Sequence, residues 1–277
     1  MGKDTVLAEW GEKFKCMNYP NELSRKPPLI KGQIDFSINK PIPILEPFVD
    51  SIWMLKNDSK KDHEVVVLPD GRLDIIFSIS LTQPFRAMQM GLATLPEKNV
   101  IPAGGIMFAV SFKLLAIEYL LDFEVGFLLN SERQLPSNFW GISENDLSDF
   151  EGFSQKISEL LVSRIDSNFD DRKQRLFQLI YDSNGTMPVK LMADKVFWSS
   201  RQINRYFKQK FGLSLKEYCK VIRFKSSLSH IKLGKLFPEL DFSDQSHFIR
   251  EIKKYSGTNP KELFRNRNDR FILLTAL

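Results

Sequence analysis

The segment from residue 188 to residue 212 constrains the fold most, because its apolar residues fit two short helices joined by a tight turn. Pro188 can open the first helix, and Ser199 can cap the second by accepting a hydrogen bond from a free backbone N–H. Phe197 and Trp198 fill the expected turn. The inward positions, at helical spacing, are Val189, Met192, Ala193 and Val196 in the first helix and Ile203, Phe207 and Phe211 in the second. This pattern predicts a helix-turn-helix unit.

The outward face of the second helix carries basic and amide side chains. From Ser199 to Phe211 the sequence contains no Asp or Glu, whereas a solvated helix surface usually mixes acids with bases. Arg, Lys and Asn are the residue types that reach base edges and phosphates in the major groove of DNA. The candidate DNA-binding residues of this helix are Ser200, Arg201, Asn204, Arg205 and Lys208. We therefore favour DNA recognition over a merely solvated surface.

A long helix and a second, similar unit follow. Ser214 and Glu217 form a capping box that begins the long helix, which is expected to stop near Gly234. From residue 215 to 233 it would be about 28 Å long, comparable to the roughly 34 Å turn of duplex DNA. Asp244 can cap the helix of the second unit. Its outward candidates for DNA binding are Gln245, Ser246, Arg250 and Lys253.

The charge of the chain is divided between its two halves. Residues 1–169 carry 17 basic and 23 acidic side chains, a net charge of −6, and residues 170–277 carry 22 and 11, a net charge of +11. A basic part joined to an acidic one is typical of a polyanion-binding domain carried by a domain that does not touch the polyanion. Nucleic acid is the first candidate, and a basic surface that only keeps the domain soluble is the alternative.

Residues 41–168 are expected to form a strand-rich domain. Short runs rich in Val, Ile and Phe, bounded by turn residues, predict strands at residues 48–55, 64–69, 73–81 and 106–112. The tripeptide at residues 69–71, Pro-Asp-Gly, predicts a hairpin turn, and residues 114–121 predict a short helix. Residues 1–40 show no sustained period and are expected to form an N-terminal arm, and residues 268–277 a C-terminal tail.

A helix with one apolar stripe is predicted between residues 147 and 165. The stripe consists of Leu147, Phe150, Phe153, Ile157, Leu160, Leu161 and Ile165. It can be a dimer interface or can pack on the strands of its own domain, and we favour the second because the run is short for a coiled coil. The polar residues 166–171 then break the pattern where the charge changes sign, and we expect the domain boundary there.

Residues 172–267 resemble the DNA-binding domain of the AraC/XylS family of transcription regulators, in which a long helix joins two helix-turn-helix units. The first match is Ser199-x-x-x-Ile203-x-Arg205-x-Phe207-Lys208, followed by Gly212, Ser214, Tyr218 and Arg223-Phe224. The second is Phe242-x-Asp244-Gln245-Ser246-His247-Phe248-x-Arg250, followed by Lys253, Gly257 and Pro260. The resemblance implies base contacts from Arg201, Asn204 and Arg205 in the first recognition helix and from Gln245, Ser246 and Arg250 in the second.

The second unit departs from the family pattern at its first helix. Pro238 stands where the family has a helix, and proline is costly in a helix interior. We therefore expect this helix to be short or displaced and the second unit to bind DNA mainly through phosphates. The strand-rich domain resembles, more weakly, the sensing domain of a subset of the family, through residues 48–53 and 68–74. Trp53 in that domain is interpreted as core rather than as part of a ligand pocket.

Several kinds of chemistry lack a sequence signal. His63, His230 and His247 have no metal-ligand spacing with Cys or acids, and no glycine-rich phosphate loop or dinucleotide fingerprint occurs. Cys16 does not supply the reactive cysteine cluster of a methyl acceptor in DNA repair, and Cys219 is expected in the core. Asp70 and Asp74 are explained by a turn and its following strand. No enzymatic activity, cofactor or metal is expected.

Together these features predict an α+β protein with a strand-rich N-terminal sensing or dimerisation domain and an all-α C-terminal domain. The expected function is sequence-specific binding of duplex DNA by a bacterial transcription regulator. We expect an activator whose DNA binding is controlled by an effector, and the residues that bind this effector are unknown. Two alternatives are an adaptor whose basic domain docks an acidic protein and a small-molecule-binding protein with a vestigial DNA-binding domain. The candidate partners are double-stranded DNA, RNA polymerase, a small-molecule effector and a second copy of the chain. Two cysteines and the lack of an apolar leader or membrane span favour the cytoplasm, with no membrane partner.

Overall fold

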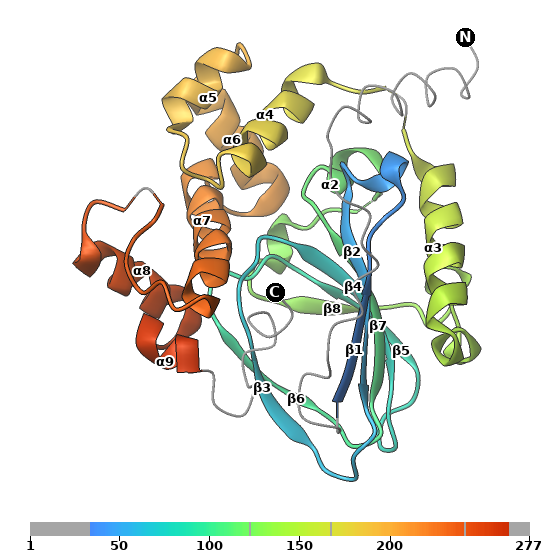
Figure 1. The fold of residues 1–277 in the computed structure, drawn as a ribbon. Helices are drawn as coiled ribbons and strands as arrows, with labels where there is room; N and C mark the ends of the chain where they lie inside the picture. Colours follow the sequence, from blue (N-terminus) through green and yellow to red (C-terminus); the bar gives the residue numbers. More distant parts are fainter. Residues whose placement is uncertain (1–33, 122, 167, 241, 266–277) are drawn as a thin grey trace.

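The computed structural model describes residues 34–265 apart from 122, 167 and 241. Strands occupy the first part of this range and helices the second (Figure 1). The expected fold class, with strands first and helices after them, is therefore confirmed.

The strands form two antiparallel sheets. The strands are β1 (Ile34–Asn39), β2 (Val49–Asn57), β3 (His63–Val67), β4 (Leu73–Ile79), β5 (Arg86–Met90), β6 (Glu97–Ile101), β7 (Ile106–Phe112) and β8 (Glu132–Leu135). Six of them form a sheet in the order β1-β2-β7-β4-β5-β8, and β3 pairs with β6 in a separate two-stranded ribbon. The runs at residues 48–55, 64–69, 73–81 and 106–112 correspond to β2, β3, β4 and β7, as predicted.

Three expectations about this region need correction. Residues 34–39 belong to the expected N-terminal arm, but they form β1, which pairs with β2 in the large sheet. Residues 1–33 of that arm lie outside the described residues. The turn at residues 69–71 exists, and Gly71 has a φ of +74°, but β3 and β4 do not pair with each other. The turn is a crossover from the ribbon to the large sheet, because β4 pairs with β5 and β7 instead. The helix expected over residues 114–121 is also shorter, since only α2 (Ala116–Tyr119) is helical.

The two faces of the large sheet are covered differently. The ribbon covers one face, where Val65 of β3 and Ile101 of β6 are buried with Phe36 of β1. Trp53 of β2 packs in this cluster, and its indole N–H donates to the Ser111 hydroxyl at 3.0 Å. Trp53 is only partly buried, so it packs at the edge of this core cluster rather than within it.

The other face carries α3 (Phe150–Arg164). Phe153 lies edge-on against Phe77 and Phe108 of the sheet, with ring centroids 5.8 and 5.2 Å apart. Ile157 and Leu161, further along the same stripe, are fully buried. The apolar stripe therefore packs on its own domain, which is the interpretation that the sequence favoured.

Helices make up the rest of the described chain. They are α4 (Asp171–Asp182), α5 (Val189–Lys195), α6 (Ser200–Phe211), α7 (Leu215–Lys232), α8 (Gln245–Ser256) and α9 (Pro260–Arg265). Figure 1 shows α3 on one side of the sheets and α5 to α9 on the opposite side. One buried apolar cluster continues from the sheet into α4, α6 and α7, so the strand-rich and helical parts share a core. In the described residues no helix has the length and apolar character needed to cross a membrane.

Candidate nucleic-acid interface

The first helix-turn-helix unit consists of α5, a turn and α6. Ser199 caps α6 in a capping box with Gln202, and Gly212 ends the helix with a φ of +79°. The inward positions Ile203, Phe207 and Phe211 are fully buried. These local contacts hold α6 in a fixed orientation with its opposite face turned outward.

The turn between α5 and α6 differs from the expectation that both of its aromatic residues fill it. Phe197 adopts a left-handed φ of +55° and is 89% exposed, so its ring contributes little to packing. Trp198 does pack, edge-on against Tyr206 with ring centroids 5.7 Å apart and beneath the guanidinium of Arg172. The turn therefore places one aromatic ring in solvent beside the start of α6.

The outward face of α6 is basic and accessible. Arg201, Arg205 and Lys208 are exposed. In the part of the chain that the structure describes, none of these three side chains takes part in an ion pair. Asn204 is half-buried and donates to the Ser200 carbonyl at 3.0 Å. Three cations on one helix face are thus available to an anionic partner.

The long helix α7 connects the two units. Ser214 and Glu217 form the predicted capping box at its start, and the helix runs for 18 residues to Lys232. Its inner side is buried, including Tyr218, Phe224 and Cys219. Burial raises the pKa of the Cys219 thiol to about 12, which keeps the group in its unreactive form.

The second unit lacks the first helix of a helix-turn-helix pair in the described residues and retains α8. Asp244 caps α8 by accepting a hydrogen bond from the backbone N–H of His247, and Gly257 ends the helix with a φ of +74°. No helix occurs among the described residues of the segment 233–244 that precedes α8. The effect expected from Pro238 is therefore larger than predicted, because the scaffold helix is missing from these residues rather than short.

The outward residues of α8 are not equally available. Ser246, Arg250 and Lys253 are exposed. Gln245 is half-buried, and its amide N–H donates to the carbonyl of Leu236 at 3.0 Å. Gln245 thus holds the preceding loop in place in this structure and is not oriented outward with the other three.

An acidic residue that the sequence did not single out attaches α8 to α7. Glu251 accepts a hydrogen bond from Arg223 at 2.9 Å and lies 3.2 Å from Lys220. Burial alone would raise the pKa of Glu251, but the charge and the hydrogen bond of Arg223 outweigh it and hold the pKa below its usual range. The charged carboxylate thus attaches α8 to α7.

A second missed residue connects the strand-rich part to α6. The buried carboxylate of Glu118 in α2 pairs with Lys173 of α4 and lies 3.9 Å from Lys210 of α6. Near this pair, the backbones of Gly126 and Gly212 come so close that a Cβ on Gly212 would lie 2.3 Å from the Gly126 oxygen. A single acid has no spacing pattern in the sequence, so only the fold could show this contact.

The residues considered for metal or acid–base chemistry have ordinary structural partners. His230 and His247 lie 3.6 Å from Glu239 and Glu251, and His63 contacts the Ser59 hydroxyl. Among the described residues, no group of three or more His, Cys, Asp or Glu side chains could hold a metal ion. Asp70 accepts from the backbone of Arg72, as its turn position predicts.

Comparison with known proteins gives two family matches. The model of a helix-turn-helix domain family matches residues 192–266 and that of a domain of unknown function, DUF6597, matches residues 38–133. The first match contains α6, α7 and α8, the elements that carry both outward faces. No curated protein matches the chain.

Similar solved structures include several of ToxT from Vibrio cholerae. An apo lysine-to-alanine variant is 12% identical, with 77% of this chain and 97% of that chain covered and a TM-score of 0.44. A structure at 1.65 Å resolution is 11% identical, with coverages of 84% and 98% and a TM-score of 0.41. A third, bound to an unsaturated fatty acid, is 13% identical, with coverages of 85% and 96% and a TM-score of 0.36.

Proposed function

We propose that the chain belongs to the AraC/XylS family of transcription regulators and recognises a DNA sequence with α6 and α8 in two adjacent segments of the major groove. The match of residues 192–266 to a helix-turn-helix domain family supports a DNA-binding regulator. The groove assignment, the contact residues and the control of binding are our proposals.

The exposed basic face of α6 carries this proposal. Arg201 and Arg205 are placed to recognise bases, because the buried stripe and the caps of α6 fix the helix while these side chains are exposed and form no ion pair with the described residues. A bidentate contact from Arg to guanine is worth about 1–3 kcal/mol of discrimination against a wrong base. Asn204 and Ser200 lie at the edge of the same face, and Lys208 is assigned to the phosphate backbone.

We assign α8 mainly to phosphate contacts. Arg250 and Lys253 are exposed cations, and Ser246 lies beside them. Gln245, the amide that the family resemblance assigned to bases, donates to Leu236 instead. Direct base recognition is therefore expected to come mostly from α6, and α8 is expected to set register and affinity.

We also propose that the strand-rich domain controls the DNA-binding helices. Glu118 reaches Lys210 of α6, so a change in the strand-rich domain has a direct route to the first recognition helix. An effector, RNA polymerase and a second copy of the chain are the further partners that we propose, in the cytoplasm where the DNA lies. The apolar stripe of α3 is already buried, so pairing of two copies would use another surface.

The test is selection of bound sequences from a random duplex pool by the full-length protein. Arg201→Ala and Arg205→Ala should weaken selection at particular base positions. Arg175→Ala is the matched control, because Arg175 is an exposed cation of α4 outside the recognition face. We expect an enriched motif whose strong base preferences lie in the segment that α6 contacts, with weaker preferences about one helical turn away, where α8 contacts the DNA.

The alternative of a protein-binding adaptor makes a different prediction in the same experiment. Salt weakens the binding of any acidic partner to a basic surface, but only a DNA reader prefers one duplex sequence over another. If the full-length protein enriches no motif at low salt, sequence-specific recognition is rejected. Partners of the basic domain would then be sought among acidic proteins.

A further inference from the structure

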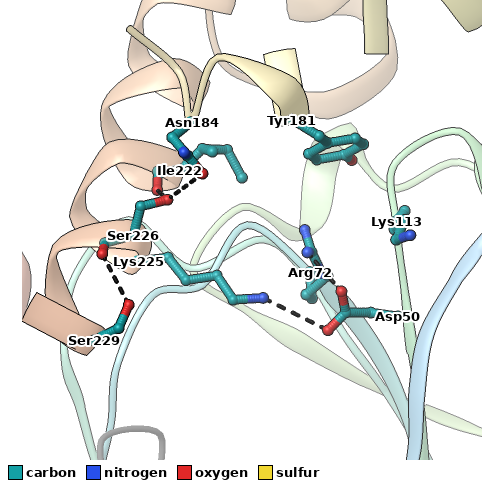
Figure 2. Close-up of a pocket in the computed structure, with 9 residues that line it drawn as sticks. All are labelled: Asp50, Arg72, Lys113, Tyr181, Asn184, Ile222, Lys225, Ser226 and Ser229. Carbon is teal, nitrogen blue, oxygen red and sulfur yellow. Dashed lines mark hydrogen bonds and ion pairs between the residues drawn. The ribbon is translucent and has the colours of Figure 1, made fainter. Parts of the chain in front are cut away.

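A cavity of about 310 Å³, lined mainly by charged and polar residues, lies where the strand-rich part meets α7. Its walls come from β2, from the residues just before β4 and just after β7, from α4 and its C-terminal loop, and from α7. Figure 2 shows Lys225 extending from α7 across this cavity toward Asp50. The cavity therefore has both halves of the molecule in its lining.

The charges that line the cavity do not balance. Arg72, Lys113 and Lys225 are cationic, and Asp50 is the single carboxylate among the lining residues. Asp50 accepts from Arg72 at 2.6 Å and lies 3.5 Å from Lys225. Lys113 donates instead to the backbone carbonyl of Glu46 at 2.6 Å. The lining thus has an excess of two formal positive charges.

The guanidinium of Arg72 makes only some of the hydrogen bonds that it could donate. The residue is only 9% exposed, and one of its terminal nitrogens bonds to Asp50. Its Nε and its other terminal nitrogen are buried and have no hydrogen-bond partner among the described residues. A buried donor without an acceptor costs about 1–3 kcal/mol, so an unpaired group of this kind in a native protein calls for a partner such as an ion or water.

We propose that this cavity binds a small phosphate dianion, either inorganic phosphate or the phosphate group of a small metabolite, through Arg72, Lys113 and Lys225. A dianion would neutralise the two excess positive charges of the lining residues, whereas a ligand with a single carboxylate would neutralise only one of them. The planar guanidinium suits the oxygens of a phosphate group, and two lysines supply point charges. The hydroxyls of Ser226 and Ser229 also line the cavity, where they donate to the Asn184 side chain and to the Ser226 carbonyl.

The position of the cavity would let a bound anion connect the strand-rich domain to α7. Lys225 belongs to the helix that joins the two recognition helices, whereas Arg72 and Lys113 belong to the strand-rich domain. A dianion held by all three would add a bond between the two parts beside the existing pair of Asp50 and Lys225. Binding of the anion itself needs no DNA, so it can be measured whether or not the proposed function holds.

The test is calorimetric titration of the full-length protein at constant ionic strength with inorganic phosphate, glycerol 3-phosphate, succinate and acetate. We expect each phosphate compound to bind saturably, with one molecule per chain. Tighter binding of inorganic phosphate would identify a free phosphate ion as the ligand, and tighter binding of glycerol 3-phosphate would identify a phosphate ester. Lys225→Gln should weaken the affinity for the phosphate compounds at least tenfold. Lys113→Gln should also weaken it, which tests the strand-rich side of the cavity independently. Lys216→Gln, the same change at an exposed position of α7, should leave it unchanged.

Three results would overturn the proposal. The first is the absence of saturable binding by either phosphate compound. The second is tighter binding of succinate or acetate than of both phosphate compounds. The third is an equal affinity of the parent protein and of folded Lys225→Gln and Lys113→Gln, with folding checked by circular dichroism.

Discussion

Arg223 of α7 donates to Glu251 of α8 at 2.9 Å, and both side chains are buried. Lys220 approaches the same carboxylate, and the guanidinium of Arg223 also lies 4.9 Å from the ring centroid of Phe242. The second recognition helix is therefore attached to α7 by a buried ion pair as well as by apolar packing. Because no scaffold helix precedes α8 in the described residues, this attachment replaces part of the support that such a helix would give.

Glu251→Ala should lower the free energy of unfolding by about 3–5 kcal/mol, because it leaves Arg223 buried without its counter-charge. Urea denaturation at neutral pH measures the change. Glu159→Ala on α3 is the control, since Glu159 is an exposed helical acid and such changes usually stay within about 0.5 kcal/mol. Equal losses in the two variants would show that the ion pair does not stabilise the attachment of α8.

A buried acid in β4 predicts how stability depends on pH. Burial raises the pKa of Asp74 from 3.8 to about 7, and the nearby charge of Asp70 adds to the effect. Between these two values the folded state holds a proton that the unfolded state releases. Stability should therefore fall as pH rises toward 7, by up to about 1.4 kcal/mol per pH unit.

Asp74→Asn should remove this slope and raise stability at pH 7 to 8, where the parent protein must bury a charged carboxylate. The Ser111 hydroxyl contacts Asp74 and can still donate to the amide oxygen of the variant. Thermal unfolding at pH 5, 6, 7 and 8 provides the comparison, with Asp35→Asn at an exposed position of β1 as the control. An unchanged slope in Asp74→Asn would assign the pH dependence to other groups.

The close approach of Gly126 and Gly212 can be tested with two glycines of similar backbone conformation. Gly212 and Gly141 have φ values of +79° and +66°, so alanine at either position is strained by about 1–2 kcal/mol. A Cβ at Gly141 meets nothing within 4 Å, whereas a Cβ at Gly212 meets the backbone oxygen of Gly126 at 2.3 Å. Gly212→Ala should therefore be the more destabilising change in urea denaturation, and equal losses would rule out a tight contact there.

The elements that could be predicted from the sequence are those specified by neighbouring residues. The caps of α6 and α7 depend on Ser199 and Ser214 and on residues three positions later, and the inward stripe of α6 follows from helical periodicity. These signals depend only on nearby residues, so they can be recognised without knowledge of the rest of the fold. The orientation of the proposed DNA-contact residues of α6 followed from the same periodicity, while their contact with DNA stays a prediction.

The features that could not be predicted depend on contacts between distant residues. The ribbon formed by β3 and β6 joins segments about 30 residues apart, and nothing in either segment specifies its partner. Glu118 and Glu251 acquire their roles only when separate helices bring cations to them. Gln245 fits the family pattern, but its orientation depends on the loop that presents the Leu236 carbonyl.

The two recognition helices should respond differently to loss of an arginine. Arg205→Ala should reduce discrimination at one base position by about 1–3 kcal/mol, because α6 is assigned to base contacts. Arg250→Ala should instead weaken binding to all sequences alike and reduce the salt dependence by about one counterion, because α8 is assigned to phosphates. The Arg250 side chain is exposed but also donates to the Ser246 carbonyl at 3.3 Å, so base contact would require it to give up this hydrogen bond. Titration of matched and single-mismatch duplexes at several salt concentrations separates the two effects. If Arg250→Ala changes base preference as much as Arg205→Ala does, base recognition is assigned to both helices.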